Sequence, residues 1–550
     1  MDSPDSHEER RSGEVCLLLG DVDAIKAFVY ESEKLPEIRG ASQLLVELEN
    51  EVKQLLANDP NIDLIYCGGG SFLAIAPPDI AEEKKKDIEQ LYLKRTKAAT
   101  ITVVLSPPLP YEDLSRGVPP HDPDSLDALH GEGVAGDLLF SHFEAVVEKR
   151  SDRKNFGEWV AFLSADLRSK KLAKKDAPFV PAFPIHRRCQ SCGKRPASVQ
   201  DKVTGEWLCQ ICWDKRERGR AAKRTVFVEE FAKWFENKYG ILLPISPPQD
   251  FSDLIDARGK IAFLYADGNN IGGLLQMAET PSQYREISKA LESALKDALF
   301  NALVVTFGEE NLVNPRGGRL RFEIIALGGD DVTVVVPACY GWKLALELLR
   351  RFAEAENLQR LGKGRSITLS AGLVFADLKY PVHFTQKLSE SLLREAKRLF
   401  REAEEESTLC HLWLRAPIAA EDAAVVMDSL YLRDGPGRRK LRLTARPFTL
   451  KQARKLTEFA EKLKLLPSHQ RRVLAEGLEK GVHTSVNLAL YQAQRLEKEK
   501  AQDLLDAFQG LGDLVSARPS TSDLLFWRQD NGEWRTALLD ALELVELGGV

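Results

Sequence analysis

The chain has 550 residues, of which 44% are hydrophobic, and a formal net charge of −6 at pH 7. This length allows about three to five domains, and the apolar content is sufficient for several hydrophobic cores. No apolar run approaches the roughly 20 residues of a membrane span, and the polar N-terminus lacks the pattern of a signal peptide. We therefore expect a cytoplasmic protein with no membrane segment, in which residues 1–13 form a disordered tail.

The first predicted domain, residues 14–178, begins with an apolar strand at residues 15–19 that is followed by Asp21. A predicted β-hairpin comes next, and a further strand is predicted at residues 100–105. The turn of the hairpin contains Gly68, Gly69 and Gly70. Because glycine permits positive φ and a close approach of a ligand to the backbone, these glycines are candidate nucleotide-binding residues.

Four of the eight cysteines form two Cys-x-x-Cys pairs that are separated by sixteen residues. This spacing is typical of a zinc ribbon, and four thiolates would form a closed, structural Zn²⁺ site. Disulfide bonds are the competing interpretation, but the remaining cysteines are scattered in apolar segments, as in a reducing compartment. The predicted zinc ligands are Cys189, Cys192, Cys209 and Cys212. We assign residues 179–257 to this ribbon and a helical linker.

A basic run at residues 215–224 follows the ribbon and leads into a predicted helix at residues 226–239. One interpretation of the run is a contact with the phosphate backbone of a nucleic acid. The alternative is the solvated face of a helix, which is the more common role of such a run.

The strongest functional signal consists of three carboxylates. Asp267 ends an apolar strand, and Asp330 and Asp331 lie at the tip of a hairpin predicted from the apolar runs on both sides. In a palm-type fold the strand lies beside the hairpin, so the three acids are expected to converge. Such oxygen ligands suit Mg²⁺ or Mn²⁺ and support a two-metal in-line displacement with ions roughly 3.5–4 Å apart. The simpler alternative is a solvated turn, because Gly and Asp are common turn residues.

Several residues around these acids are candidate nucleotide contacts. They lie in the glycine-rich turn after the strand, in the hairpin turn, and on a helix predicted at residues 384–402. A lysine on this helix would complement a polyphosphate, although a lysine on an amphipathic helix is more often solvated. The candidates are Gly268, Asn269, Asn270, Gly328, Gly329 and Lys397. We assign residues 258–408 to this palm.

Residues 409–550 are predicted to form a C-terminal helical domain, because apolar residues recur there at helical spacing. Individual helices are predicted at residues 501–511 and 535–547.

The two palm-like segments form an imperfect repeat. Residues 63–77 align without gaps on residues 323–337, and Gly70 and Ser71 stand where the second copy has its paired acids. The sequence therefore predicts one catalytic and one degenerate palm. The expected fold class is α+β and multidomain, with two ferredoxin-like palm domains of the nucleotide cyclase or polymerase type, a zinc ribbon and a C-terminal helical domain.

Taken together, these motifs resemble the large polymerase-cyclase subunit of type III CRISPR effector complexes, in the form that lacks the N-terminal His-Asp nuclease domain. The resemblance covers nearly the whole chain and is more specific than any single motif. It rests on the ribbon, on the helical C-terminus and on the segments at residues 20–23, 35–42, 328–331, 370–373 and 396–397.

The resemblance implies that two ATP molecules bind between the palms and that target RNA paired to a guide RNA releases synthesis of cyclic oligoadenylates. It also implies that Asp330 and Asp331 are the catalytic pair and that Asp267 is the strand acid of the palm. The implied partners are the other effector subunits, among them the small subunit and the subunit that caps the 5′ end of the guide RNA.

Two other functions fit parts of the sequence. A cyclic dinucleotide synthase of the GGDEF class shares the palm, but the hairpin lacks the Glu-Phe that follows the first Asp in that class. The second alternative is a non-enzymatic scaffold of a ribonucleoprotein, in which the acids are only an inherited turn.

Overall fold

The computed structural model describes residues 13–118, 155–174, 181–221, 226–243, 246–314, 318–362, 366–403, 406–416, 418–435, 440–516, 523–530 and 532–549. The predicted disordered tail lies almost wholly outside these residues. The contacts divide the chain into two compact units, each of which is described by itself. The first unit comprises Met1–Val29, Ala41–Asp214 and Asn270–Glu292, and the second comprises Tyr30–Gly40, Lys215–Asn269 and Ser293–Val550. The domain bounds derived from the sequence stay predictions.

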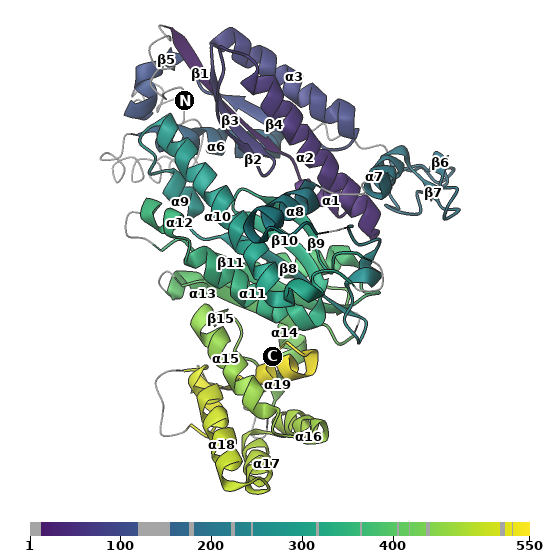
Figure 1. Ribbon diagram of the computed structural model, residues 1–550, viewed down its shortest axis with the longest axis vertical. Helices are drawn as coiled ribbons and strands as arrows, with labels where there is room; N and C mark the ends of the chain where they lie inside the picture. Colours follow the sequence, from purple (N-terminus) through teal and green to yellow (C-terminus); the bar gives the residue numbers. More distant parts are fainter. Residues whose placement is uncertain are drawn as a thin grey trace, which may run out of the picture. The chain divides into compact units, whose positions relative to one another are not determined.

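The first unit contains a sheet with the strand order β2-β3-β1-β4, in which β5 also pairs with β1 (Figure 1). Its strands are β1 (Glu14–Val22), β2 (Asp63–Gly68), β3 (Ser71–Ala76), β4 (Ile101–Leu105) and β5 (Leu109–Pro110). Its helices include α1 (Ile25–Val29), α2 (Leu35–Ala57, whose first residues belong to the second unit), α3 (Pro78–Thr96) and α6 (Phe156–Ala173). This strand order is that of a ferredoxin-like fold, as predicted for the first palm.

The first unit also contains the cysteine-rich segment and the short strands β6 (Val199–Gln200) and β7 (Trp207–Leu208). The helix α7 (Gln210–Ala221) begins in this segment. The helix α9 (Ile271–Leu275) and the first part of α10 (Pro281–Phe307) complete the unit.

The second unit contains a six-stranded sheet with the order β15-β12-β11-β8-β10-β9, of which β8, β9, β10 and β11 are labelled in Figure 1. The strands are β8 (Lys260–Gly268), β9 (Glu323–Gly328), β10 (Asp331–Pro337), β11 (Leu369–Asp377), β12 (Thr408–Trp413) and β15 (Phe448–Thr449). The four strands β11-β8-β10-β9 repeat the order of the first sheet, so the prediction of two ferredoxin-like palms is confirmed.

Two helices cover opposite faces of the second sheet. The helix α11 (Ala338–Ala353) packs on one face, where a Cβ at Gly341 would meet Ala262 and Phe375. The helix α13 (Val382–Glu402) packs on the other face, and it buries Leu388 and Leu392. Further helices of this unit are α8 (Val226–Tyr239), α12 (Glu356–Leu361) and α14 (Ala423–Tyr431). The prediction for residues 226–239 is therefore confirmed.

The C-terminal region is mostly helical, as predicted, and also contains a sheet that the sequence pattern does not indicate. The helices are α15 (Leu450–Leu463), α16 (Ser468–Glu479), α17 (Val482–Gln494), α18 (Lys498–Asp513) and α19 (Leu538–Leu547). The sheet has the order β13-β14-β17-β16, with β13 (Leu432–Asp434), β14 (Lys440–Arg442), β16 (Trp527–Asp530) and β17 (Glu533–Thr536). The prediction of a helix from residue 535 is wrong at its start, since strands of three or four residues are too short to show a period.

Candidate active site

The three aspartates predicted to be catalytic lie on neighbouring strands of the second sheet. Asp267 on β8 and Asp331 on β10 are direct antiparallel partners, and Asp331 also pairs with Gly328. Asp330 therefore sits in a two-residue turn, whose first residue, Gly329, has a φ of 61°. A turn with positive φ matches the twist of the flanking strands, which is why glycine is required there.

Burial and the neighbouring negative charges raise the pKa of Asp330 above its ordinary value. Burial raises its pKa to about 7, and the charges of Asp267 and Asp331 act in the same direction, whereas Lys397 acts against them. In the absence of a bound cation, the turn acid of this hairpin is therefore harder to ionise than an exposed aspartate.

The strand acids are engaged by different partners. The ammonium group of Lys397, on α13, donates to the carboxylate of Asp267 and lies 3.1 Å from the carbonyl oxygen of Gly268. The hydroxyl of Tyr265 lies 3.4 Å from the carboxylate of Asp331. Lys397 thus contacts the acid cluster itself, which fits a charge complement more closely than a solvated lysine.

The expected convergence of the carboxylates on one point is not present in this arrangement. Among the described residues, the only group of three or more potential metal ligands whose atoms all lie within 4.8 Å of one another is the cysteine cluster. The three aspartates are neighbours in register, and their oxygen donors suit Mg²⁺ or Mn²⁺ by type. Binding one ion through all three would require their side chains to turn toward each other.

The glycine-rich turn after Asp267 is held by the protein itself. The N–H of Gly268 donates to the carbonyl oxygen of Asp330 over 3.0 Å. Asn269 is buried, and its amide group lies within hydrogen-bond distance of Thr368 and Ser370. Asn270 has a φ of 56° and precedes α9. A contact of nucleotide with these residues, or with Gly328 and Gly329, stays a prediction.

The first unit contains a counterpart of the pair formed by Asp267 and Lys397. Lys171, on α6, donates to the carboxylate of Asp21 and lies 2.9 Å from the carbonyl oxygen of Val22. Ser71 is the antiparallel partner of Asp21, so the position of Asp331 has no carboxylate. The sequence analysis did not identify Lys171.

A second lysine neutralises the next acid of the first palm. Lys174 lies 2.7 Å from the carboxylate of Asp23, which also accepts hydrogen bonds from Thr100 and Thr102. Burial would raise the pKa of Asp23, but these hydrogen bonds and the charge of Lys174 hold it below its ordinary value. The acids of this palm are therefore neutralised within the protein.

The glycine turn of the first palm is only partly open to a ligand. A Cβ at Gly68 would meet no atom within 4 Å. The N–H of Gly70, however, donates to the carboxylate of Glu49 over 3.0 Å. A phosphate at Gly70 would meet this negative charge, whereas the space at Gly68 is open. A nucleotide contact with Gly68, Gly69 or Gly70 stays a prediction.

The four predicted zinc ligands do lie together. Their sulfur atoms are within 4.8 Å of one another, and those of Cys192 and Cys209 are 3.9 Å apart. A tetrahedral Zn²⁺ site with bonds of about 2.3 Å has sulfur–sulfur edges of about 3.8 Å. The N–H of Cys212 donates to the sulfur of Cys209, and Gly193 has a φ of 67° in the first knuckle. The donor set fits structural zinc.

Two residues of the basic run fit neither of its predicted interpretations. Lys215 forms an ion pair of 3.3 Å with Glu31, and Arg216 forms one of 2.5 Å with Glu37. All four side chains are at most 5% exposed. These cations are therefore internal ion pairs of the second unit and cannot contact RNA or solvent.

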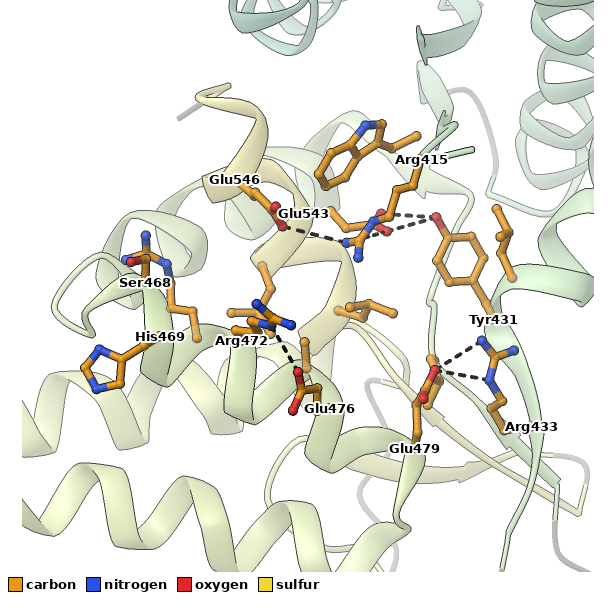
Figure 2. A pocket seen from close by; sticks show the side chains of 17 residues that line it. Arg415, Tyr431, Arg433, Ser468, His469, Arg472, Glu476, Glu479, Glu543 and Glu546 are labelled. Carbon is orange, nitrogen blue, oxygen red and sulfur yellow. Dashed lines mark hydrogen bonds and ion pairs between the residues drawn. The ribbon is translucent and has the colours of Figure 1, made fainter. Parts of the chain in front are cut away.

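A cavity of about 740 Å³ lies in the C-terminal region, away from the aspartates (Figure 2). It is lined by side chains from the end of β12 and from α14, α16 and α19. The ion pairs between its lining residues are Arg415–Glu543, Arg415–Glu546, Arg433–Glu479 and Arg472–Glu476. Because these charges neutralise one another, we do not assign a nucleotide to this cavity.

Residues 260–404 match the family model described as Cas10/Cmr2, second palm domain. The second palm is therefore similar to the second palm domain of Cas10/Cmr2. The matched segment contains Asp267, Asp330, Asp331 and Lys397, because it extends from the first residue of β8 to the end of α13. The match confirms the resemblance to the large subunit of type III CRISPR effector complexes.

Solved structures that are similar to the chain include three Csm1-Csm4 cassettes. The cassette in complex with AMPPNP has 16% identity and a TM-score of 0.43, with 72% of this chain and 54% of the other covered. The complex with cA4 has 16% identity and a TM-score of 0.44, with 98% and 70% covered. The apo cassette has 15% identity and a TM-score of 0.45, with 100% and 72% covered.

In the first of these comparisons the chain spans about half the length of the solved protein. No curated protein matches the chain. Within the part of the chain that the structure describes, no helix combines the length and the apolar content needed to cross a membrane.

Proposed function

We propose that the chain is the large subunit of a type III CRISPR effector complex and that its second palm converts ATP to cyclic oligoadenylates when target RNA is bound. The observation that carries this proposal is the cluster of three carboxylates and one lysine. Asp267 and Asp331 are partners in register, Asp330 is next to Asp331 in the turn, and Lys397 contacts Asp267. The match to the Cas10/Cmr2 palm supports the same class of chemistry.

The residues that would hold Mg²⁺ or Mn²⁺ are Asp267, Asp330 and Asp331. When bound, these ions supply positive charge at the reacting phosphate and orient the attacking and leaving oxygens. In the proposed reaction a bond forms between a ribose 3′ oxygen and the α-phosphorus of ATP, and the bond from that phosphorus to the pyrophosphate breaks. Little covalent chemistry is required of the protein, whose main contributions are positioning and charge neutralisation.

Lys397 supplies the positive charge that belongs to the chain itself. Its ammonium group contacts Asp267 and the carbonyl oxygen of Gly268. It would therefore lie beside the triphosphate of a nucleotide bound at the three aspartates. Hydrogen bonds between two ionised groups are about twice as strong as neutral ones. We propose that Lys397 orients the triphosphate and that the four cysteines hold a structural Zn²⁺.

The remaining parts of the proposal follow from the resemblance. They are a cytoplasmic location, a guide RNA paired with target RNA, and the partner subunits of the effector complex, including the small subunit and the guide-RNA 5′-end-capping subunit.

The proposal is tested by mass analysis of the products that the assembled complex makes from ATP with matched target RNA. We expect the masses of cyclic oligoadenylates, and we expect them only when the RNA is present. Turnover of GTP without RNA would instead identify a synthase of the GGDEF class. If neither nucleotide is consumed in the presence of Mg²⁺ or Mn²⁺, the chain is a scaffold and the proposal is wrong.

A further inference from the structure

A chain of buried polar contacts crosses the second sheet beside the acids. The Ser370 hydroxyl lies 2.8 Å from the side-chain oxygen of Asn269 and 2.8 Å from the hydroxyl of Thr408. Thr408 donates to the carbonyl oxygen of Ala396 over 2.8 Å. Ser370 and Thr408 are fully buried, and Asn269 is 4% exposed. Because buried polar groups are costly unless they are hydrogen-bonded, this chain fixes one arrangement of the elements that it joins.

Ser370 and Thr408 lie in the same row of the sheet as Asp267 and Asp331. Asp331 pairs with Asp267, Asp267 pairs with Ser370, and Ser370 pairs with Thr408. Side chains that are directly opposite each other on adjacent strands point to the same face. Asp267 and Asp331 therefore share one face and one register position with the hydroxyls of Ser370 and Thr408, on the side of the sheet that α13 covers.

The series of buried polar contacts begins and ends next to the residues that form the Lys397 contact. Asn269 follows Gly268, whose carbonyl oxygen accepts from Lys397. Ala396 immediately precedes Lys397 on α13. The polar chain thus joins the two backbone segments that bring the lysine to Asp267.

A glycine lets α13 approach the sheet closely enough for this contact. A Cβ at Gly372 would lie 2.0 Å from the carbonyl oxygen of Ser389 and 2.8 Å from the backbone nitrogen of Leu393. The helix is therefore seated on β11 at Gly372 and tied to β12 through Thr408. Two fixed points define both the height of the helix above the sheet and its position along its own axis.

We propose that Ser370 and Thr408 are positioning residues, which hold Lys397 against Asp267 and Gly268 through the buried hydrogen bonds to Asn269 and Ala396. The inference deepens the proposed function and rests on it for its catalytic consequence. It assigns a role in the reaction to two residues that do not touch the acids. Their hydroxyls set where the positive charge of Lys397 lies relative to the triphosphate.

The test compares two substitutions at one position of the full chain. Thr408→Val keeps the shape of the side chain and removes the hydroxyl, whereas Thr408→Ser keeps the hydroxyl and removes a methyl group. The first measurement is the rate at which Lys397 reacts with an amine-directed label, followed by peptide mass mapping and normalised to exposed lysines. The second is kcat and KM for ATP in the assembled complex with target RNA.

With Thr408→Val we expect Lys397 to react at least about fivefold faster and kcat/KM for ATP to fall on the order of tenfold, because a small misplacement of a positioned group costs a large part of its effect. With Thr408→Ser both quantities should stay within about twofold of the wild-type values. If Thr408→Val unfolds the protein, Ser370→Ala removes the same connection with a smaller deletion and should give the same labelling result.

A Thr408→Val protein that is less stable but shows unchanged labelling and unchanged kcat/KM would overturn the inference, since the hydroxyl would then only support the fold. The labelling result does not depend on catalysis. A wild-type complex that does not consume ATP would refute the proposed function, whereas labelling would still decide whether Thr408 positions Lys397.

Discussion

The two palms share a strand order and a pair of charged residues but differ at the hairpin. Lys171 contacts Asp21 and the carbonyl of the next residue, and Lys397 makes the same two contacts with Asp267 and Gly268. The pair of strand acid and helix lysine therefore belongs to the shared palm fold. The two carboxylates at the second hairpin are what the first hairpin lacks, and in the proposed function they would hold the metal ions.

The hairpins differ in backbone as well as in side chains. In the first turn both Gly69 and Gly70 have positive φ, at 64° and 82°, whereas in the second turn Gly329 has a φ of 61° and Asp330 is not in the positive region. A Cβ at Gly70 would also lie 2.5 Å from the side chain of Ile25. The first hairpin therefore cannot accept an aspartate at this position without rearrangement, and its degeneracy is built into the turn.

The largest effect is expected from substitution of Asp267, which occupies the same register position in the second palm as Asp21 does in the first. Asp267→Asn should lower product formation at least about a hundredfold, because one carboxylate of the metal site is lost. Asp21→Asn should change it less than about threefold, since Ser71 stands opposite it. Product formation by the assembled complex with target RNA measures both. Equal losses in the two variants would break the comparison.

Removal of zinc should act on the cysteine-rich segment of the first unit. Four thiolates without a cation are not expected to keep their mutual contacts, because structural zinc supplies much of the folding energy of such segments. After chelation, hydrogen exchange should accelerate in residues 189–212 and stay unchanged in β8, β10 and β11. A segment that exchanges equally slowly with and without metal would show that the cluster does not need zinc.

The two lysines should differ in how they affect metal binding. Lys397→Met removes the cation that competes for Asp267, so the nucleotide-free protein should bind Mn²⁺ several-fold more tightly, while kcat/KM for ATP falls. Lys171→Met should leave Mn²⁺ binding unchanged, because the first palm lacks the hairpin carboxylates. Titration of Mn²⁺ followed by electron paramagnetic resonance measures both variants. Weaker Mn²⁺ binding with Lys397→Met would contradict this account.

The smallest effect concerns β12, a strand that extends the second sheet and has no counterpart among the described residues of the first sheet. Neither ring nitrogen of His411 has a hydrogen-bond partner within the described residues. Burial, together with the nearby charge of Arg446, holds the pKa of His411 well below its ordinary value. The ring is therefore neutral in the folded protein, whereas the unfolded chain binds a proton as the pH falls below about 6.5.

Because the unfolded state binds the additional proton, His411 should make the protein less stable as the pH falls below about 6.5. The melting temperature of the wild type should decrease between pH 7.5 and pH 5.5 by roughly a few degrees more than that of His411→Leu. An equal decrease in the two proteins would show that this histidine does not contribute.

The parts of the fold that could be predicted are those with a local sequence pattern, such as an apolar run or a cysteine spacing, that is long enough to indicate one structure. The apolar runs on both sides of the aspartate hairpin correspond to β9 and β10, and the cysteine spacing predicted four sulfur atoms that do lie together. The short strands β13, β14, β16 and β17 were missed because strands of three or four residues are too short to show a period, and because the pairing of β14 with β17 joins residues far apart in the sequence.

Lys171 could not be found from the repeat because the number of residues between the hairpin and the lysine differs in the two copies. The two hairpins are 260 residues apart, whereas the two lysines are 226 residues apart, so an alignment without gaps does not join them. The contact of Lys397 with Asp267, and the different partners of the three aspartates, depend on side-chain conformations that no spacing encodes.

The central claim is that the paired acids of the second hairpin carry out the chemistry. Its most direct test is the double variant Asp330→Ala and Asp331→Ala in the assembled complex, with products from ATP measured by mass analysis and binding of target RNA measured in parallel. We predict that the oligoadenylate product is lost while RNA binding stays at the wild-type level. Product formation that continues in this variant would contradict the account.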